Sequence, residues 1–371
     1  MKSRRMVVAM LIGTAIVFFA HICFYKEYGV LDYYLFADFN HHLLICAAIL
    51  FVSMLGTYAA HLLGYLICGS LSGYKLISIE IYGFIFRQKS GKLTVEKYNG
   101  RSGIYVNMAP PEFADGHFPF ALYNVGAIVA FITVSLIALS VVLFYFFADV
   151  PLVALYWFCV FIWFFWNAVL YLLPVECKSI SVLKKNRLLK SSYNIRRAFW
   201  NANTVYAELK KGTRLREQPA ELFILPSQEE MVNSISAEIA WLKLNRLLDE
   251  ESFEKADKLV DFIISDRCEL SDFKKNIAVL DKIYIELINS CRPDVIESLL
   301  REDIRLFMQQ NSKFITVVRT ELALALLYYK DIGTTADYRV RFSECIKNEP
   351  YPANISAEID LVNLAERIAS E

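Results

Sequence analysis

The sequence predicts a membrane protein that is mainly α-helical, with four transmembrane helices, a small cytoplasmic β-hairpin or sheet, and an all-α C-terminal domain. Of its 371 residues, 56% are hydrophobic and 14% aromatic. Its mean hydropathy is positive, so the chain is too apolar for an ordinary soluble protein of this length. Nearly all the long uncharged runs lie before Glu176, and the remainder is charged and mixed. Between the second and third runs the apolar period becomes strand-like.

The four long uncharged runs predict four membrane-spanning helices. We expect them at residues 6–25, 42–69, 119–148 and 150–175. Each is long enough for the roughly 20 residues that cross a bilayer as helix. The first run lacks a convincing small-x-small cleavage site, so we interpret it as a retained helix rather than a signal peptide. A short connection at Asp149 predicts that the last two helices form a tight hairpin.

The loop charges predict the orientation of these helices. Basic residues gather at the N-terminus, in the loop from Lys75 to Pro119 and after the fourth helix, whereas the loop between the first two helices is mostly acidic. The positive-inside rule therefore places both the N-terminus and the C-terminus in the cytoplasm. We expect a multi-pass protein of the cell membrane, with the lipid bilayer as its first partner.

Residues 75–108 predict a small β insertion. The stretch "LISIEIYGFIF" alternates, with isoleucines at 77, 79, 81 and 85 expected on one face and Ser78 and Glu80 on the other. The stretch "RQKSG" is typical of a turn, and "KLTVEKY" resumes the alternation, which together predict a hairpin. A third short strand is expected at 103–108.

Such a sheet has an edge that can bind an extended peptide by strand addition. We therefore take Ile77, Ile79 and Ile81 as candidate peptide-binding residues. The alternative is a hairpin that only caps the helix ends, because exposed sheet edges are usually blunted.

The C-terminal part predicts a linker at 176–225 and a cytoplasmic helical domain at 226–371. Its amphipathic stretches are about 15 residues long with short breaks between them. Two of the helix pairs resemble tetratricopeptide-like repeats, whose stacking makes a concave peptide-binding surface. A packed helical bundle that stabilises or dimerises the membrane part is the alternative.

Charge and cysteine content exclude two further classes. The 39 basic and 39 acidic residues give a net charge of zero, and no block of like charge stands out, so nucleic acid is not an expected partner. The eight cysteines are scattered without a C-x-x-C pair. We therefore expect neither a disulfide framework nor a cysteine zinc site.

The most informative motif is "HLLGY" at residues 61–65, inside the second apolar run. It has the frame of the H-E-x-x-H helix of zinc proteases. Together with "GYKLISIEIYG", "MAPPE", the stretch from Asn167 to Pro174 and "RRAFW", it resembles the site-2 protease family of intramembrane zinc metalloproteases. The likeness is to a bacterial branch with a helical cytoplasmic tail, and it covers about Thr57 to Trp200.

The resemblance implies a degenerate, inactive member of that family. There, two histidines and a later aspartate hold zinc, and the glutamate is the general base. His61 matches the first ligand, but Leu62 replaces the glutamate and Tyr65 the second histidine. Between Asn167 and Arg196 no aspartate follows, and Glu176 is the one acid. Because a catalytic zinc needs about three protein ligands, we expect no metal, no cofactor and no catalytic residue.

Two other interpretations stay open. The chain could be an active zinc metalloprotease with displaced ligands, for instance with His117 approaching the site, or a membrane-anchored scaffold.

For His61 itself we expect a hydrogen bond to a backbone carbonyl or to Asn167. Tyr65, one helical turn on, is expected to pack beside the imidazole, and its hydroxyl is a further candidate partner.

Asn124 and Asn167 are polar groups near membrane depth, so they must face protein or a cavity. They are candidate peptide-binding residues, or they hold helices together.

The leading hypothesis is a catalytically inactive membrane protein that binds a peptide or membrane-protein client, in the maturation, export, sensing or immunity of a small secreted peptide.

Overall fold

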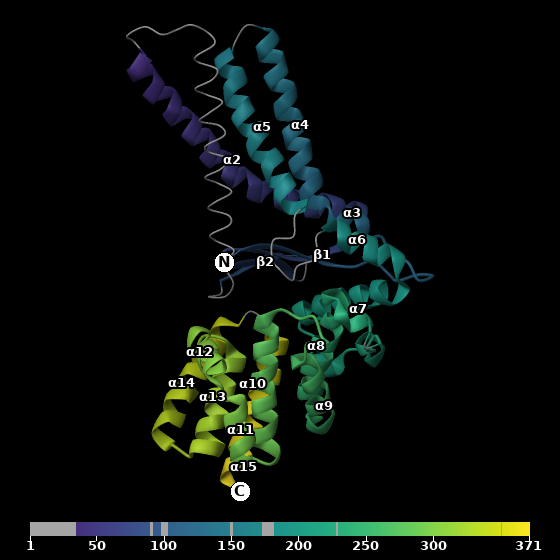
Figure 1. Cartoon of the computed structure of the whole chain (residues 1–371), viewed down its shortest axis with the longest axis vertical. Coiled ribbons are helices and arrows are strands. Elements are labelled where there is room, and N and C mark those ends of the chain that lie inside the picture. The colour runs from purple at the N-terminus through teal and green to yellow at the C-terminus, as the bar shows by residue number, and fades with distance from the viewer. Residues whose placement is uncertain are drawn as a thin grey trace. The chain divides into compact units, whose positions relative to one another are not determined.

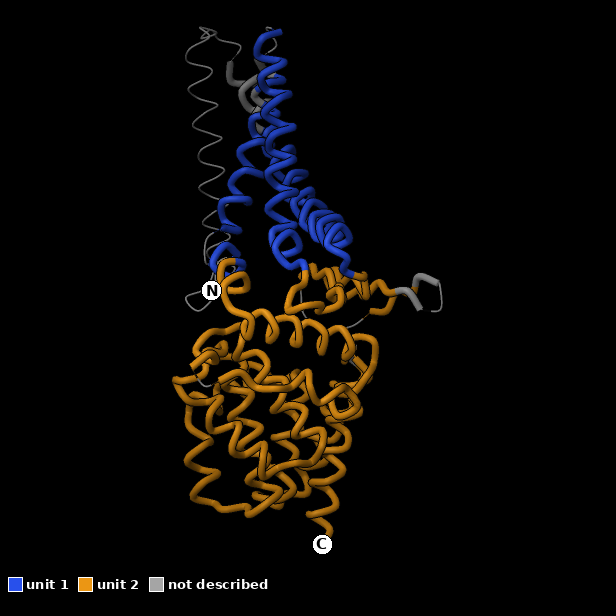
Figure 2. The backbone as a smooth tube through the Cα atoms, turned by 90° about the vertical axis from the view of Figure 1, so that its right-hand side faces the viewer, with its two compact units in different colours: residues 1–74, 119–186 blue, residues 75–118, 187–371 orange. Residues whose placement is uncertain are grey.

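The chain folds mainly as α-helix, with one small antiparallel sheet, as the sequence predicts (Figure 1). The computed structural model describes residues 35–89, 92–97, 103–148, 151–172, 182–227, 229–349 and 351–371. Contacts divide the chain into two compact units (Figure 2). The first unit holds the described residues up to Tyr74 together with Pro119–Asn186, and the second holds Lys75–Phe118 and Arg187–Glu371.

The first unit is built from long apolar helices. They are α2 (Leu35–Leu71), the short α3 (Ala121–Asn124), α4 (Gly126–Phe147), α5 (Pro151–Leu172) and the first half of α6 (Val182–Ser191). Helices α4 and α5 lie side by side, and α2 runs obliquely against both (Figure 1). Small and aromatic side chains alternate in their shared core, for example Ala60, Phe131 and Trp163, which lets the helices approach closely.

Two helices in the described residues are long and apolar enough to cross a membrane. They are Leu44–Leu71 and Gly126–Phe147, and only 17% and 28% of their most apolar windows are buried. Helix α5 adds a shorter apolar stretch, Tyr156–Leu172. The expected helix at 6–25 lies outside the described residues. Membrane association therefore fits the structure, whereas the four spans and the orientation stay predictions.

The sheet contains four strands where the sequence predicted three. They are β1 (Lys75–Ile81), β2 (Phe84–Lys89), β3 (Lys92–Lys97) and β4 (Ile104–Ala109), paired antiparallel in the order β3-β2-β1-β4. The stretch "LISIEIYGFIF" is two strands rather than one. It breaks at Tyr82 and Gly83, whose φ angles of 42° and 87° are both left-handed. Two consecutive residues with positive φ are typical of a type I′ hairpin turn.

This turn overturns one sequence prediction, the face on which Ile85 lies. In the hairpin, Ile81 pairs with Phe84 and Glu80 pairs with Ile85. Because paired residues share a face of the sheet, Ile85 lies with Glu80 and not with Ile79 and Ile81. The expected alternation assumed an uninterrupted strand, whereas a two-residue turn changes which side each later residue occupies.

The second unit continues with helices as far as the C-terminus. They are α7 (Tyr193–Lys211), α8 (Ser234–Asp249), α9 (Phe253–Ile264), α10 (Asp272–Asn289), α11 (Pro293–Leu299), α12 (Glu302–Gln310), α13 (Ile315–Ala323), α14 (Ile332–Asn348) and α15 (Pro352–Ser370), with short 3₁₀ turns η1 (Leu215–Glu217), η2 (Ala220–Phe223) and η3 (Glu230–Val232) and a π-helical η4 (Leu324–Tyr329). The expected linker at 176–225 thus contains two helices, α6 and α7.

Helix α7 connects the sheet to the helical core of this unit. It begins at Ser192, whose hydroxyl caps the Ile195 amide, and ends at Gly212, whose φ of 105° is left-handed. It packs against β1 and β4 and also against α8. Neighbouring helices then pack in sequence from α8 to α10 and on through α13 and α14. This order is compatible with stacked helix pairs, and the tetratricopeptide-like identity stays a prediction.

Candidate functional site

His61 lies on α2 and bonds to a tyrosine of α5. The hydroxyl of Tyr171 is 2.6 Å from Nδ1 of His61. Tyr171 donates this bond when the imidazole carries its proton on Nε2. The sequence-based expectations of a carbonyl, Asn167 or Tyr65 as partner were therefore wrong. Tyr171 stands one helical turn beyond Asn167, so it occupies the same face of α5.

Aromatic rings surround this pair. Tyr65 packs edge-on to His61 with ring centroids 5.0 Å apart, as expected one helical turn away. Tyr123 lies 5.5 Å from Tyr65, and Tyr74 stacks on Tyr123 at 4.1 Å. We call these three tyrosines together with Tyr171 the tyrosine cluster: Tyr65, Tyr74, Tyr123 and Tyr171. It gives His61 neighbours with hydroxyl groups but without charge.

A close helix crossing fixes the position of this cluster. A Cβ atom placed on Gly64 would lie 2.3 Å from the carbonyl oxygen of Gly126, and one on Gly126 would lie 2.7 Å from that of Gly64. The backbones of α2 and α4 therefore touch at this point, which only glycine permits. The small residue inside "HLLGY" serves this crossing, which sets His61 and Tyr65 beside the start of α4.

The donors near His61 do not fit a zinc ion. Leu62 is half-buried and offers no lone pair, and Tyr65 offers a phenol where a second imidazole would stand. Within the described ranges, no group of three His, Cys, Asp or Glu side chains could hold a metal. A catalytic zinc takes about three nitrogen, sulfur or carboxylate ligands. His117, the candidate displaced ligand, lies in the bridge that pairs it with Ala114, and Glu176 lies outside the described residues.

The two asparagines singled out by the sequence bond within the first unit. Asn124 is 6% exposed and donates to the side chain of Asn186 at 2.7 Å. Asn186 donates in turn to the Ala121 carbonyl at 3.3 Å. Asn167 donates to the Trp163 carbonyl at 2.8 Å. The Asn124 bond joins α3 to α6 and favours the interpretation that this asparagine holds helices together, whereas the Asn167 bond stays within α5.

A second hydrogen bond between α2 and α5, besides the His61–Tyr171 bond, comes from Trp163 and Thr57. The Trp163 indole donates to the Thr57 hydroxyl at 2.8 Å, and Thr57 donates to the Ser53 carbonyl at 2.9 Å. Thr57 begins the stretch that resembles a protease helix. Its role here is to accept an inter-helix hydrogen bond four residues before His61.

The three candidate isoleucines lie on the same face of β1. Ile77, Ile79 and Ile81 are half-exposed, whereas Ser78 and Glu80 between them are buried, at 3% and 6% exposure. The polar face of the strand is thus the inner one, because it packs against α7. This arrangement is the reverse of the usual one in soluble sheets.

Glu80 is a buried centre that the sequence analysis did not identify. Its carboxylate accepts from Asn107 at 2.6 Å, from Lys210 at 3.2 Å and from the Tyr351 hydroxyl. Burial raises the pKa of Glu80, but the Lys210 charge and the hydrogen bonds from Tyr351, Asn107 and Lys210 outweigh it, so the pKa lies below its ordinary value. The sequence feature that could have identified this buried centre is a glutamate between two isoleucines of an expected strand.

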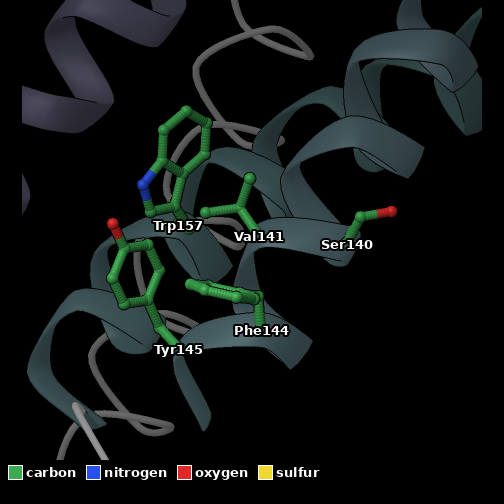
Figure 3. A pocket seen from close by; sticks show the side chains of 5 residues that line it. All are labelled: Ser140, Val141, Phe144, Tyr145 and Trp157. Atoms are coloured by element: carbon green, nitrogen blue, oxygen red, sulfur yellow. The ribbon is translucent and has the colours of Figure 1, made fainter. Parts of the chain in front are cut away.

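A shallow pocket lies between α4 and α5. Its volume is about 460 Å³, and it is lined by Ser140, Val141, Phe144, Tyr145 and Trp157 (Figure 3). Trp157 precedes Tyr171 by 14 residues, about 21 Å along a helix, so the pocket is separate from the tyrosine cluster. Its walls carry no charged group and therefore offer no acid–base chemistry.

No family model, curated protein or solved structure matches this chain.

Proposed function

We propose that the chain is a catalytically inactive, multi-pass membrane protein of the site-2-protease type that binds an extended peptide or a membrane-protein client. The proposal keeps four spans, with both termini in the cytoplasm. The observation that carries it is the chemistry around His61: the position that would hold zinc has one imidazole, and that imidazole is bonded to a phenol.

The inactivity follows from what hydrolysis requires. A zinc protease needs an ion to polarise water and a carboxylate to take its proton. At the matching positions stand Leu62 and Tyr65, and the nearest described neighbour of the imidazole is the Tyr171 hydroxyl. A phenol ordinarily titrates near pH 10, so at neutral pH it is a poor base.

The client-binding part is supported by the sheet. Its strand order makes β3 and β4 the outer strands. An extended chain can pair with such a strand through its backbone, while side-chain contacts select the sequence. On β4 the Tyr105 side chain is 41% exposed and available for such a contact. Ile77, Ile79 and Ile81 lie on β1, which is paired on both sides, so a client strand would add beside β4 or β3 rather than beside these isoleucines.

The helical domain would provide a second recognition surface if its helix pairs stack as tetratricopeptide-like repeats do. The setting we favour is bacterial: the maturation, export, sensing or immunity of a small secreted peptide. The resemblance in the sequence supports this setting.

Metal analysis of the purified full-length protein separates this proposal from an active zinc enzyme. We expect far less than one zinc per chain, and no difference between the wild type and His61→Ala. One zinc per chain that is lost in His61→Ala, with chelator-sensitive cleavage of a peptide, would favour the enzyme with displaced ligands.

Photocrosslinking tests the client. A photoreactive amino acid at Tyr105 is compared with one at Ile332, which is 88% exposed on α14 and serves as the control. We expect one small peptide or membrane protein to crosslink from position 105 but not from 332 under native expression. No specific adduct from either position would favour the membrane-anchored scaffold.

A further inference from the structure

The sheet of the second unit has one face that is mainly apolar. The register places seven side chains together on it: Ile79, Ile81, Phe84, Phe86, Val95, Ile104 and Val106. None of the seven is fully buried, and Phe84 and Val95 are 43% and 54% exposed. None belongs to a hydrophobic core cluster of the described residues.

The opposite face is polar and yet better buried. Ser78 and Glu80 lie there with Ile85, at 3%, 6% and 0% exposure. Burying a carboxylate costs free energy unless it is paired, and here Lys210 and Asn107 pair it. The fold therefore turns its polar side inward and its apolar side outward, which is unfavourable in water. Such a sheet suits a site where the outer phase is itself apolar.

The chain connection places the sheet close to such a phase. Helix α2 ends at Leu71, and β1 begins at Lys75. The turn between them is tight, since the Tyr74 amide donates to the Gly69 carbonyl at 2.9 Å and Gly73 takes a left-handed φ of 76°. Four residues reach at most about 14 Å. Because α2 is long and apolar enough to cross a membrane, the sheet is tethered near the point where α2 would leave the bilayer.

The charges at the margin of this face match anionic lipid. Lys97 pairs with Phe84 and therefore lies on the apolar face, at its edge, and its side chain is exposed. Lys75 is exposed at the start of β1. An apolar surface with cations at its rim binds at the boundary between acyl chains and anionic headgroups. A soluble client would not require this combination.

We propose that the apolar face of the sheet docks on the surface of an anionic bilayer, with Phe84 and Val95 entering the headgroup region and Lys75 and Lys97 contacting lipid phosphates. This interaction is independent of the proposed client. It would leave the outer strands β3 and β4 open along the membrane surface, where a client could pair with them.

Depth measurement on the full-length protein in vesicles tests the proposal. The chain contains eight cysteines, so the spin label is introduced as a nitroxide amino acid, at Val95 in one sample and at Tyr105 in another. Tyr105 pairs with Glu80 and therefore lies on the opposite face. In phosphatidylglycerol-rich vesicles we expect the label at 95 to collide mainly with oxygen, which dissolves in lipid, and the label at 105 mainly with a water-soluble nickel chelate.

Two other results of the depth measurement would contradict docking of the apolar face on the bilayer. A label at 95 that is open to the nickel chelate would mean that the face lies in water. A label at 95 shielded from both relaxers would mean that protein covers the face, whether helices of the same chain, a client or a second copy. Neither result would affect the client or zinc experiments, so this inference can fail separately.

The two lysines are tested with the same label. In the double variant Lys75→Gln, Lys97→Gln, we expect the label at 95 to become shallower in phosphatidylglycerol-rich vesicles and to stay unchanged in phosphatidylcholine. An unchanged depth in both lipids would refute the role of the lysines in contacting anionic headgroups.

Discussion

His61 in the first unit and Glu80 in the second are both titratable groups that accept or share a hydrogen bond with a tyrosine hydroxyl. Their surroundings differ in charge. Glu80 faces the ammonium group of Lys210 and two further donors, whereas the described contacts of His61 are phenols and rings. Glu80 is therefore held as an anion, whereas none of the described contacts of His61 carries a negative charge that would stabilise an imidazolium.

This difference shows that the two units use different kinds of polar interaction. In the first unit, polar groups join helices without charge, and a glycine contact brings the backbones together. In the second unit, an ion pair between Glu80 and Lys210 ties the sheet to α7, and a hydrogen bond from the Tyr351 hydroxyl ties it to the residue that precedes α15. Losing a partner should therefore cost most at Glu80, less at the glycine crossing and least at the His61 pair.

Glu80→Ala should have the largest effect. It leaves the Lys210 ammonium group and the Asn107 amide without their acceptor, and breaking a buried ion pair in this way costs about 3 kcal/mol of unfolding free energy. Pulse proteolysis of the full-length protein in detergent measures it. The control is Asp303→Ala, which removes an exposed ion pair with Arg301 and should change little. Equal losses in the two variants would contradict a buried role for Glu80.

Gly64→Ala should cost about 2 kcal/mol, because the new methyl group meets the Gly126 carbonyl and overpacked sites lose stability of this order. Gly56→Ala on the same helix is the matched control, since its methyl group would lie 3.4 Å from Phe164, an ordinary contact. Thermal unfolding in detergent compares the two. If both alanines are equally tolerated, the backbone contact of α2 and α4 is looser than described.

Tyr171→Phe should cost about 1 kcal/mol, because it removes one hydrogen bond between helices and leaves the imidazole nitrogen unpaired. A double-mutant cycle with His61→Ala isolates this interaction from the loss of packing. Additive effects of the two substitutions would mean that the hydroxyl and the imidazole do not interact.

Acidification should produce a smaller effect through Glu80. Its pKa in the folded chain lies below the ordinary value of 4.5, so near that pH the unfolded state binds more protons than the folded state. The stability it contributes is present above pH 4.5 and is lost as the pH falls through the lower, folded value. Below pH 4.5, unfolding free energy should fall more steeply for the wild type than for Glu80→Gln. Parallel curves would mean that the carboxylate is not held as an anion.

The sequence predicted the long helices of the first unit closely, because uncharged runs limit where helices can begin and end. The expected helices at 42–69 and 150–175 correspond to α2 and α5 within several residues. The expected strand at 103–108 corresponds to β4. The position of Ile85 failed because a two-residue turn at Tyr82 is locally compatible with a continuing strand.

The contacts of the candidate site could not be predicted in the same way. Tyr171 is 110 residues from His61 in the chain, and Tyr351 is 271 residues from Glu80. Such pairs depend on how helices and strands pack, which periodicity within one segment does not encode. The replacement of glutamate by Leu62 was visible directly, because it depends on one residue type at one position.

The length of α2 has a consequence for any bilayer that this helix crosses. Its apolar stretch has 28 residues, which corresponds to about 42 Å along the helix axis, whereas a hydrocarbon core is about 30 Å thick. A helix of this length fits by leaning about 45° from the bilayer normal, or by stretching the bilayer. A thinner bilayer demands more lean and a thicker one less, so acyl-chain length alone would change the angle of the helix that carries His61.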